Sequence, residues 1–290
     1  YLAWESGETV HVNTVEPDKV EDYFNTWPEL LNGVEKFKPK LFPKGLYYTD
    51  AYMEYGCFGI MTRRVLTEAE QHILSRFSKE FERAYSRFLG LQKAEAQARE
   101  AQIETALERV RSRTMAMQKG EELKDVVVLL YKELIALGLT NFVTCGYVEI
   151  DEAAKRQLTW VTSPGGDSLG LFYLPLTGDA VFDERYKAWK EQQSVFHQTV
   201  AGKKRRKHLE YAITTFQSKE AEELVRKQFP DPCVFYCFNF SHGYLHLVGG
   251  SKLSKDEEAL LARFTRVFEQ TYARFLDLKK AEAQAREAQI

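Results

Sequence analysis

Four cysteines carry the most reactive side chains of this chain: Cys57, Cys145, Cys233 and Cys237. Cys233 and Cys237 are four positions apart, so on a β-strand both side chains would point to the same face. Together with Cys145 they suggest a redox site, which would need thiols of lowered pKa. The alternative is that all three are buried structural thiols. No CxxC pair or dense disulfide spacing is present, so a reducing cytoplasm is the expected compartment.

Histidines are the next candidates for site chemistry. His197, His208, His242 and His246 lie in residues 104–290. His242 and His246 are four apart across an expected turn and strand, and no neighbouring cluster of Asp, Glu or Cys completes a set of metal ligands. We therefore predict no metal site, and the sequence names no cofactor.

Aromatic residues supply the candidate ligand site. On an expected strand at 233–240, strand alternation places Tyr236, Phe238 and Phe240 on one face, opposite Phe235, Cys237 and Asn239. An aromatic-lined cavity for a small molecule is one interpretation, and an ordinary aromatic core is the other. The candidate residues are Tyr147, Trp160, Phe172, Tyr211, Phe216, Tyr236, Phe238 and Phe240.

Charge and motifs exclude several classes of function. Forty Lys and Arg against 42 Asp and Glu give a net charge of −2, so the chain lacks the basic excess of a nucleic-acid-binding protein. The basic run Lys203–Lys207 is expected in a loop, either solvated or touching an acidic loop of a neighbouring domain. No apolar run approaches the length of about 18 residues needed to insert into a membrane. The common nucleotide-binding and hydrolase motifs are missing, which predicts a non-catalytic segment.

An internal repeat organises the chain. The stretch Ala94–Ile103 recurs letter for letter as Ala281–Ile290, an offset of 187 positions, and the similarity continues upstream of both copies. We predict that residues 1–103 are the C-terminal part of a unit whose complete copy is 104–290. No cysteine is shared between the copies: Cys237, for example, falls on Asp50. This difference favours structural thiols over a redox site.

Hydrophobic periodicity and turn residues predict the elements of the complete copy. Helices are expected at 103–117 and 123–137, then three strands, a helix, a strand, a helix, a two-stranded hairpin and a long helix from Ser254. The expected strands are 141–150, 157–162, 171–176, 194–200, 233–240 and 244–248, and the intervening helices are 179–192 and 218–227.

This order resembles the GAF domain, an α+β fold with a six-stranded antiparallel sheet whose terminal helices pack on one face. The stretch 235–258 carries most of the resemblance, with two aromatic and apolar strands around Ser241-His242-Gly243 and then Leu253-Ser254-Lys255-Asp256-Glu257-Glu258. The expected parts are a partial GAF-like domain (1–90), a connector helix (91–122), a complete GAF-like domain (123–278) and the start of another connector (279–290).

The connector has an interrupted apolar seam, with a change of heptad phase near residues 94–103. One interpretation is a helix that pairs in a parallel homodimer and relays signals, as in sensor histidine kinases. The other is an ordinary helix that links two domains. The candidate seam residues are Phe81, Phe88, Leu91, Ala98, Ala101, Ile103, Leu107, Val110 and Met117.

The resemblance implies a cytoplasmic sensory module that responds to a small ligand or a partner and passes the change to an output domain, a histidine kinase. The phosphoacceptor-histidine helix and the Gly-rich ATP lid of a kinase are missing here, so this chain would be the input part. A structural repeat that assembles into an array without a ligand is the alternative. A thiol redox enzyme, like the methionine-sulfoxide-reducing branch of GAF-like proteins, is a third hypothesis resting on Cys145, Cys233 and Cys237.

Overall fold

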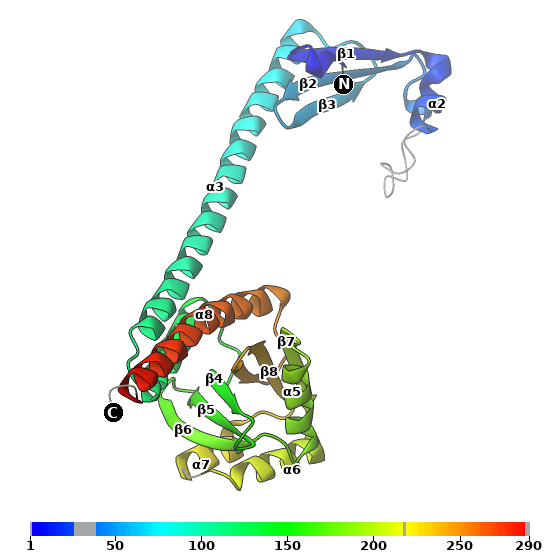
Figure 1. Cartoon of the computed structure of the whole chain (residues 1–290). Helices are drawn as coiled ribbons and strands as arrows, with labels where there is room; N and C mark the ends of the chain where they lie inside the picture. Colours follow the sequence, from blue (N-terminus) through cyan, green and yellow to red (C-terminus); the bar gives the residue numbers. More distant parts are fainter. Residues whose placement is uncertain (1, 26–38, 217–218, 288–290) are drawn as a thin grey trace. The chain divides into compact units, whose positions relative to one another are not determined.

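The computed structural model describes residues 2–25, 39–216 and 219–287. The chain forms two compact units, Tyr1–Ala98 (unit 1) and Arg99–Ile290 (unit 2). It is an α+β protein with antiparallel sheets. Its helix α3 is long and runs from Glu68 to Met115 (Figure 1). Among the described helices, none combines the length and the apolar character needed to cross a membrane.

Unit 2 is built on a six-stranded sheet with the order β6-β5-β4-β9-β8-β7, in which every neighbouring pair is antiparallel (Figure 1). The strands follow the predicted segments closely, because β-branched and aromatic residues between turn signals define them. Their bounds are Thr144–Asp151 (β4), Arg156–Thr162 (β5), Ser168–Pro175 (β6), Val195–Val200 (β7), Cys233–Phe240 (β8) and Gly243–Gly249 (β9).

One face of this sheet is covered by α4 (Leu123–Ala136), α8 (Lys255–Glu287) and the last turns of α3. The leucine stripe of α4 is fully buried there, as its 3-4 spacing predicts. Tyr147 of β4 stacks on Phe268 of α8 with ring centroids 3.4 Å apart. The hydrophobic core between the sheet and these helices is the largest of the four in the described part of the chain.

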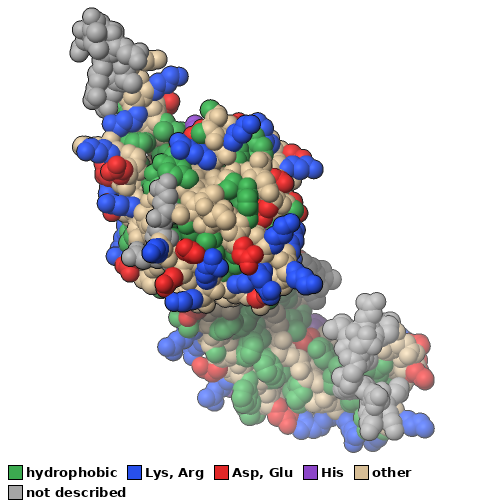
Figure 2. Space-filling model, turned by 90° about the horizontal axis from the view of Figure 1, so that it is seen from below, with side chains coloured by type: hydrophobic (Ala, Val, Ile, Leu, Met, Phe, Trp, Pro, Cys, Tyr) green, Lys and Arg blue, Asp and Glu red, His purple; other side chains and the backbone are tan. Residues whose placement is uncertain are grey.

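The opposite face carries α5 (Ala180–Lys190), α6 (Gly202–Ile213) and α7 (Lys219–Gln228) (Figure 1). The prediction of a loop at Lys203–Lys207 was wrong, because this run forms the first turns of α6. The helix is amphipathic, and its buried residues begin directly after the run, with His208, Leu209 and Ala212. Lys and Arg side chains accordingly lie on the surface seen from below in Figure 2.

Unit 1 contains a three-stranded sheet with the order β1-β2-β3 and the first part of α3. The register of its strand pairs matches that of β7-β8-β9. In unit 1, Val10 is opposite Ala51. In unit 2, Val195, 185 positions after Val10, is opposite Phe238, 187 positions after Ala51. The elements are Leu2–Glu5 (α1), Val10–Val15 (β1), Pro17–Lys19 (η1), Val20–Asn25 (α2), Pro39–Leu41 (η2), Leu46–Met53 (β2) and Gly56–Thr62 (β3).

Equivalent aromatic residues of the two units differ sharply in exposure. On α8 of unit 2 they are buried, with exposed fractions of 7% or less: Phe264, Phe268, Tyr272 and Phe275. Their equivalents on α3, 187 positions earlier, have exposed fractions between 37% and 62%: Phe77, Phe81, Tyr85 and Phe88. We call this exposed set, together with Leu91 (59%), the aromatic stripe of unit 1. The same residue types are therefore core in one unit and surface in the other.

The candidate seam residues divide at the start of unit 2. Phe81, Phe88, Leu91, Ala98 and Ala101 are exposed. The C-terminal members pack into the core of unit 2, where α4 and α8 cover them: Ile103, Leu107, Val110 and Met117. A side chain buried inside one unit is not available to a second copy, so the surface open to helix pairing ends near Ala101.

Candidate functional site

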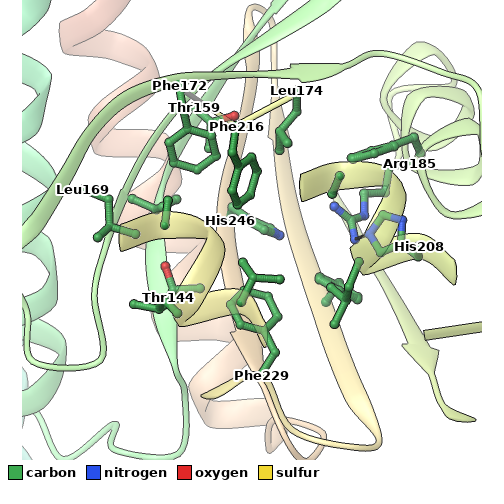
Figure 3. A pocket seen from close by; sticks show the side chains of 18 residues that line it. Thr144, Thr159, Leu169, Phe172, Leu174, Arg185, His208, Phe216, Phe229 and His246 are labelled. Carbon is green, nitrogen blue, oxygen red and sulfur yellow. Dashed lines mark hydrogen bonds between the residues drawn. The ribbon is translucent and has the colours of Figure 1, made fainter. Parts of the chain in front are cut away.

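Unit 2 contains an apolar cavity between the sheet and the helices α5, α6 and α7 (Figure 3). The space open to the centre of a water molecule is about 50 Å³. Because one water needs roughly 10–15 Å³ of such space, the cavity admits about three to five water-sized groups. Its apolar lining consists of Val161, Leu169, Phe172, Leu174, Phe182, Leu209, Ala212, Phe216, Ala221, Leu224, Val225, Phe229 and Phe235.

Five polar side chains interrupt this apolar lining: Thr144, Thr159, Arg185, His208 and His246. We call them the polar cluster. Each has an exposed fraction of 7% or less. Figure 3 shows Arg185 and His208 together on one side, with the ring of His246 between them and Leu169. Buried polar groups are costly unless they are hydrogen-bonded, so their partners decide what the cavity can hold.

Arg185 is placed by α5, whose N-cap is Asp179. One carboxylate oxygen of Asp179 accepts a hydrogen bond from the backbone N–H of Phe182 at 2.9 Å. The guanidinium carbon of Arg185 lies 4.1 Å from the ring centroid of Phe235, a cation–π contact. Its Nε has no hydrogen-bond partner. Within the described part of the chain, Arg185 forms no salt bridge.

His208 connects Arg185 to Asp179. Its Nδ1 is 2.7 Å from the Asp179 carboxylate, and its Nε2 is 3.5 Å from an Nη of Arg185. Burial and the neighbouring Arg185 lower the pKa of His208 to about 4, although Asp179 opposes this shift. The ring is therefore neutral at pH 7, with a proton on Nδ1 that is donated to Asp179 and an Nε2 that accepts from Arg185.

His246 and the two threonines complete the polar cluster. Burial, together with Arg185 and His208, lowers the pKa of His246 well below its usual value. Its Nε2 has no hydrogen-bond partner, and neither have the hydroxyls of Thr144 and Thr159. These groups come from β4, β5 and β9, which are adjacent in the sheet. A buried cation and several unsatisfied polar atoms thus line one small apolar space.

The structure brings only some of the candidate ligand residues to this cavity. Phe172 and Phe216 line it, with ring centroids 5.0 Å apart. Tyr211 lies on α6 beside it and donates a hydrogen bond to the Thr177 carbonyl at 3.2 Å. The others belong to the core on the opposite face of the sheet, against α4 and α8: Tyr147, Trp160, Tyr236, Phe238 and Phe240.

Sequence reasoning did not select Arg185, and it treated His246 only as a strand residue. One signal was available: His246 alternates with Leu245 and Leu247, which places it on the face opposite those leucines. Phe235 shares that face, and its ring stacks on that of His246 with ring centroids 6.1 Å apart. For Arg185 the sequence offers no equivalent signal, because its partners His208 and Phe235 are 23 and 50 positions away, on α6 and β8.

The cysteines do not converge on a site. Cys145 packs in the core under α4 and α8, whereas Cys233 and Cys237 lie on the opposite face of the sheet. Burial raises the pKa of each of these three thiols to about 12. A thiol of this pKa is protonated at neutral pH and is a poor nucleophile. Their positions fit structural thiols and give the redox hypothesis no support.

Thiol labelling tests this assignment. We expect Ellman's reagent to modify one cysteine of the native protein, Cys57, which is exposed. The three buried thiols should react only when urea unfolds the chain. A Cys57→Ser variant is the control and should lose the native reaction. Rapid native labelling of Cys145, Cys233 or Cys237 would contradict the assignment.

Metal binding finds no support in the described residues, where no group of three His, Cys, Asp or Glu side chains is placed to hold an ion. Comparison with protein-family models, with curated proteins and with solved structures finds no match for this chain.

Proposed function

We propose that this chain is a sensory or regulatory module in which unit 2 binds a small ligand in the cavity beneath α5, α6 and α7. The observation that carries the proposal is the polar cluster, a buried Arg185 and unsatisfied polar atoms in an otherwise apolar cavity. Pockets of this composition, largely apolar with a few convergent polar groups, are typical of ligand sites. Such a cluster is costly to bury unless a ligand satisfies it.

The sheet offers a route from the cavity to the helices. Thr144 of β4 and His246 of β9 line the cavity, while Tyr147 and Leu245 on the same strands pack toward α8. A shift of these strands on binding would change the contact between Tyr147 and Phe268. A ligand shifts such an equilibrium only by its differential affinity for the two packings.

We further propose that unit 2 is a GAF-like domain and that unit 1 is the last part of another. The six-stranded antiparallel sheet, with α4 and α8 on one face, supports the first statement. The shared register of β1-β2-β3 and β7-β8-β9 supports the second. A cytoplasmic histidine kinase is the output that the resemblance suggests.

Pairing of α3 between two copies would carry the signal, through the exposed part of the seam. Disulfide cross-linking tests it in a Cys57→Ser background. A parallel pair predicts that Ala98→Cys cross-links rapidly between copies. Ala96→Cys, two positions away on the opposite side of the helix, is the matched control and should cross-link slowly. Equal rates for both variants would contradict a defined seam.

Assembly into an array is the second candidate function, and the aromatic stripe of unit 1 favours it, because an exposed apolar surface of this kind marks interaction sites. Native mass spectrometry of the purified chain separates the two proposals. A dimer with added mass supports ligand sensing. A ladder of higher oligomers without added mass supports the array and contradicts the sensor.

A further inference from the structure

We propose that the ligand of unit 2 is a short-chain monocarboxylate whose carboxylate pairs with Arg185 and whose alkyl group lies among Phe172, Phe216 and the aliphatic lining. This inference deepens the proposed function and rests on it, since it names the chemical class that the cavity would hold. Three features of the cavity carry the argument: its charge, its unsatisfied polar atoms and its size.

The charge of the cavity selects an anion with a single charge. Arg185 is the sole Lys or Arg among the described residues that line it. The negative charge nearest to Arg185 in the network is Asp179, which reaches it only through the neutral ring of His208. One guanidinium pairs well with one carboxylate, whereas a phosphate dianion usually requires several cations or backbone N–H groups.

The unsatisfied atoms select a ligand that accepts hydrogen bonds. The Nε–H of Arg185 is a donor, and the hydroxyls of Thr144 and Thr159 can each donate one hydrogen bond. All three side chains have exposed fractions of 3% or less, so bulk water does not satisfy them. A carboxylate accepts a charge-assisted hydrogen bond from Arg185, which is stronger than a neutral one. The two threonines are not placed to share that carboxylate, because Thr159 is opposite Val148, four residues from Thr144 on β4.

The size and the remaining lining select a short alkyl chain. The space admits about three to five water-sized groups. Acetate has four non-hydrogen atoms and propionate has five, so both match the cavity without movement of α6 or α7. Leu169, Phe172 and Phe216 lie on the side away from Arg185, together with Thr144 and Thr159, and none of these side chains carries a charge (Figure 3). The aromatic and aliphatic groups among them suit an alkyl chain, and a second carboxylate would be buried there without a cation to pair with.

Isothermal titration calorimetry on the full chain, in a buffer free of carboxylates and phosphate, tests the class directly. We expect acetate and propionate to bind with Kd values in the micromolar to millimolar range, as ligands of this size allow. Propionamide has the same shape as propionate without its charge, and we expect it to bind at least about tenfold more weakly. Inorganic phosphate should not bind in the cavity.

Two variants link binding to Arg185. Arg185→Gln should weaken propionate at least about tenfold, whereas Arg206→Gln removes the same charge from an exposed site on α6 and should leave Kd unchanged. Circular dichroism establishes that each variant is folded. If Arg185→Gln does not fold, Phe216→Trp replaces it, because the larger ring takes the space that the alkyl group needs and should weaken propionate at least about tenfold.

Each outcome decides between the two proposals. Equal affinity for propionate and propionamide, tight binding of phosphate, or unchanged binding in the cavity variant would overturn the carboxylate class. A neutral compound retained in native mass spectrometry would also overturn it while leaving the ligand-sensing function intact. If no carboxylate binds and no added mass is retained, both proposals fail.

Discussion

Replacing Phe268 with alanine is expected to lower the free energy of unfolding of unit 2 by about 3–5 kcal/mol. The ring has an exposed fraction of 1% and contacts Tyr147, Phe240 and Tyr272. Its removal leaves a cavity between α8 and the sheet that the surrounding side chains fill only in part. Urea unfolding followed by tryptophan fluorescence measures the loss in a Trp4→Phe, Trp27→Phe background, which leaves only Trp160 and Trp189, both buried in unit 2.

The repeat provides a matched control. Phe81, 187 positions before Phe268, has an exposed fraction of 49%. Phe81→Ala deletes the same atoms from an equivalent place on a helix, and we expect it to cost about 1 kcal/mol or less, because little burial is lost. Hydrogen exchange of β2 and β3 reports on unit 1 separately. A loss as large as that of Phe268→Ala would show that another polypeptide covers the aromatic stripe in solution.

Acidification is expected to destabilise unit 2 through His208. The folded-state pKa of His208 is about 4, and its value in the unfolded chain is near 6.5. Between these values the unfolded state binds a proton that the native state does not, so stability falls as the pH falls. The effect is absent above about pH 7 and amounts to roughly 2 kcal/mol at pH 5. His246, whose pKa is also lowered, acts in the same direction.

Urea unfolding at pH 7.5, 6 and 5 measures this dependence. His208→Asn is the informative variant, because an Asn amide group can donate the hydrogen bond to Asp179 but does not titrate. We expect its unfolding free energy to fall less steeply between pH 7.5 and 5 than that of the unchanged chain. An identical slope in both proteins would contradict a buried neutral His208.

The order of elements followed from local sequence signals. The strand β8 begins and ends where aromatic alternation and the turn Ser241-His242-Gly243 predict, at Cys233 and Phe240. The long helix after Ser254 begins at Lys255. Helix α6 was missed because its first turns hold five consecutive basic residues, which show no apolar period. Its apolar face starts only at His208, and packing against Phe182 and Phe235 stabilises it.

Alternation gave the two faces of β8 but not what covers each face. Tyr236 and Phe238 share one face, as expected, yet α4 and α8 cover that face and make it core. The cavity lies on the other face, with Phe235. Period two is a property of a single strand, whereas the choice of covering helix depends on contacts between residues far apart in the chain.

The sequence by itself determined the internal repeat, the strand segments and the long helices, because each depends on the spacing of residues that are close together in the chain or on direct similarity between its two copies. Tertiary structure alone decided which copy of the aromatic set is buried, since the equivalents of Phe264 and Phe268 lie exposed on α3. It also decided the polar cluster. Asp179, Arg185, His208 and His246 are separated by up to 67 positions and meet only because α5, α6 and β9 pack against one another. Burial there lowers the pKa of both histidines and keeps them neutral.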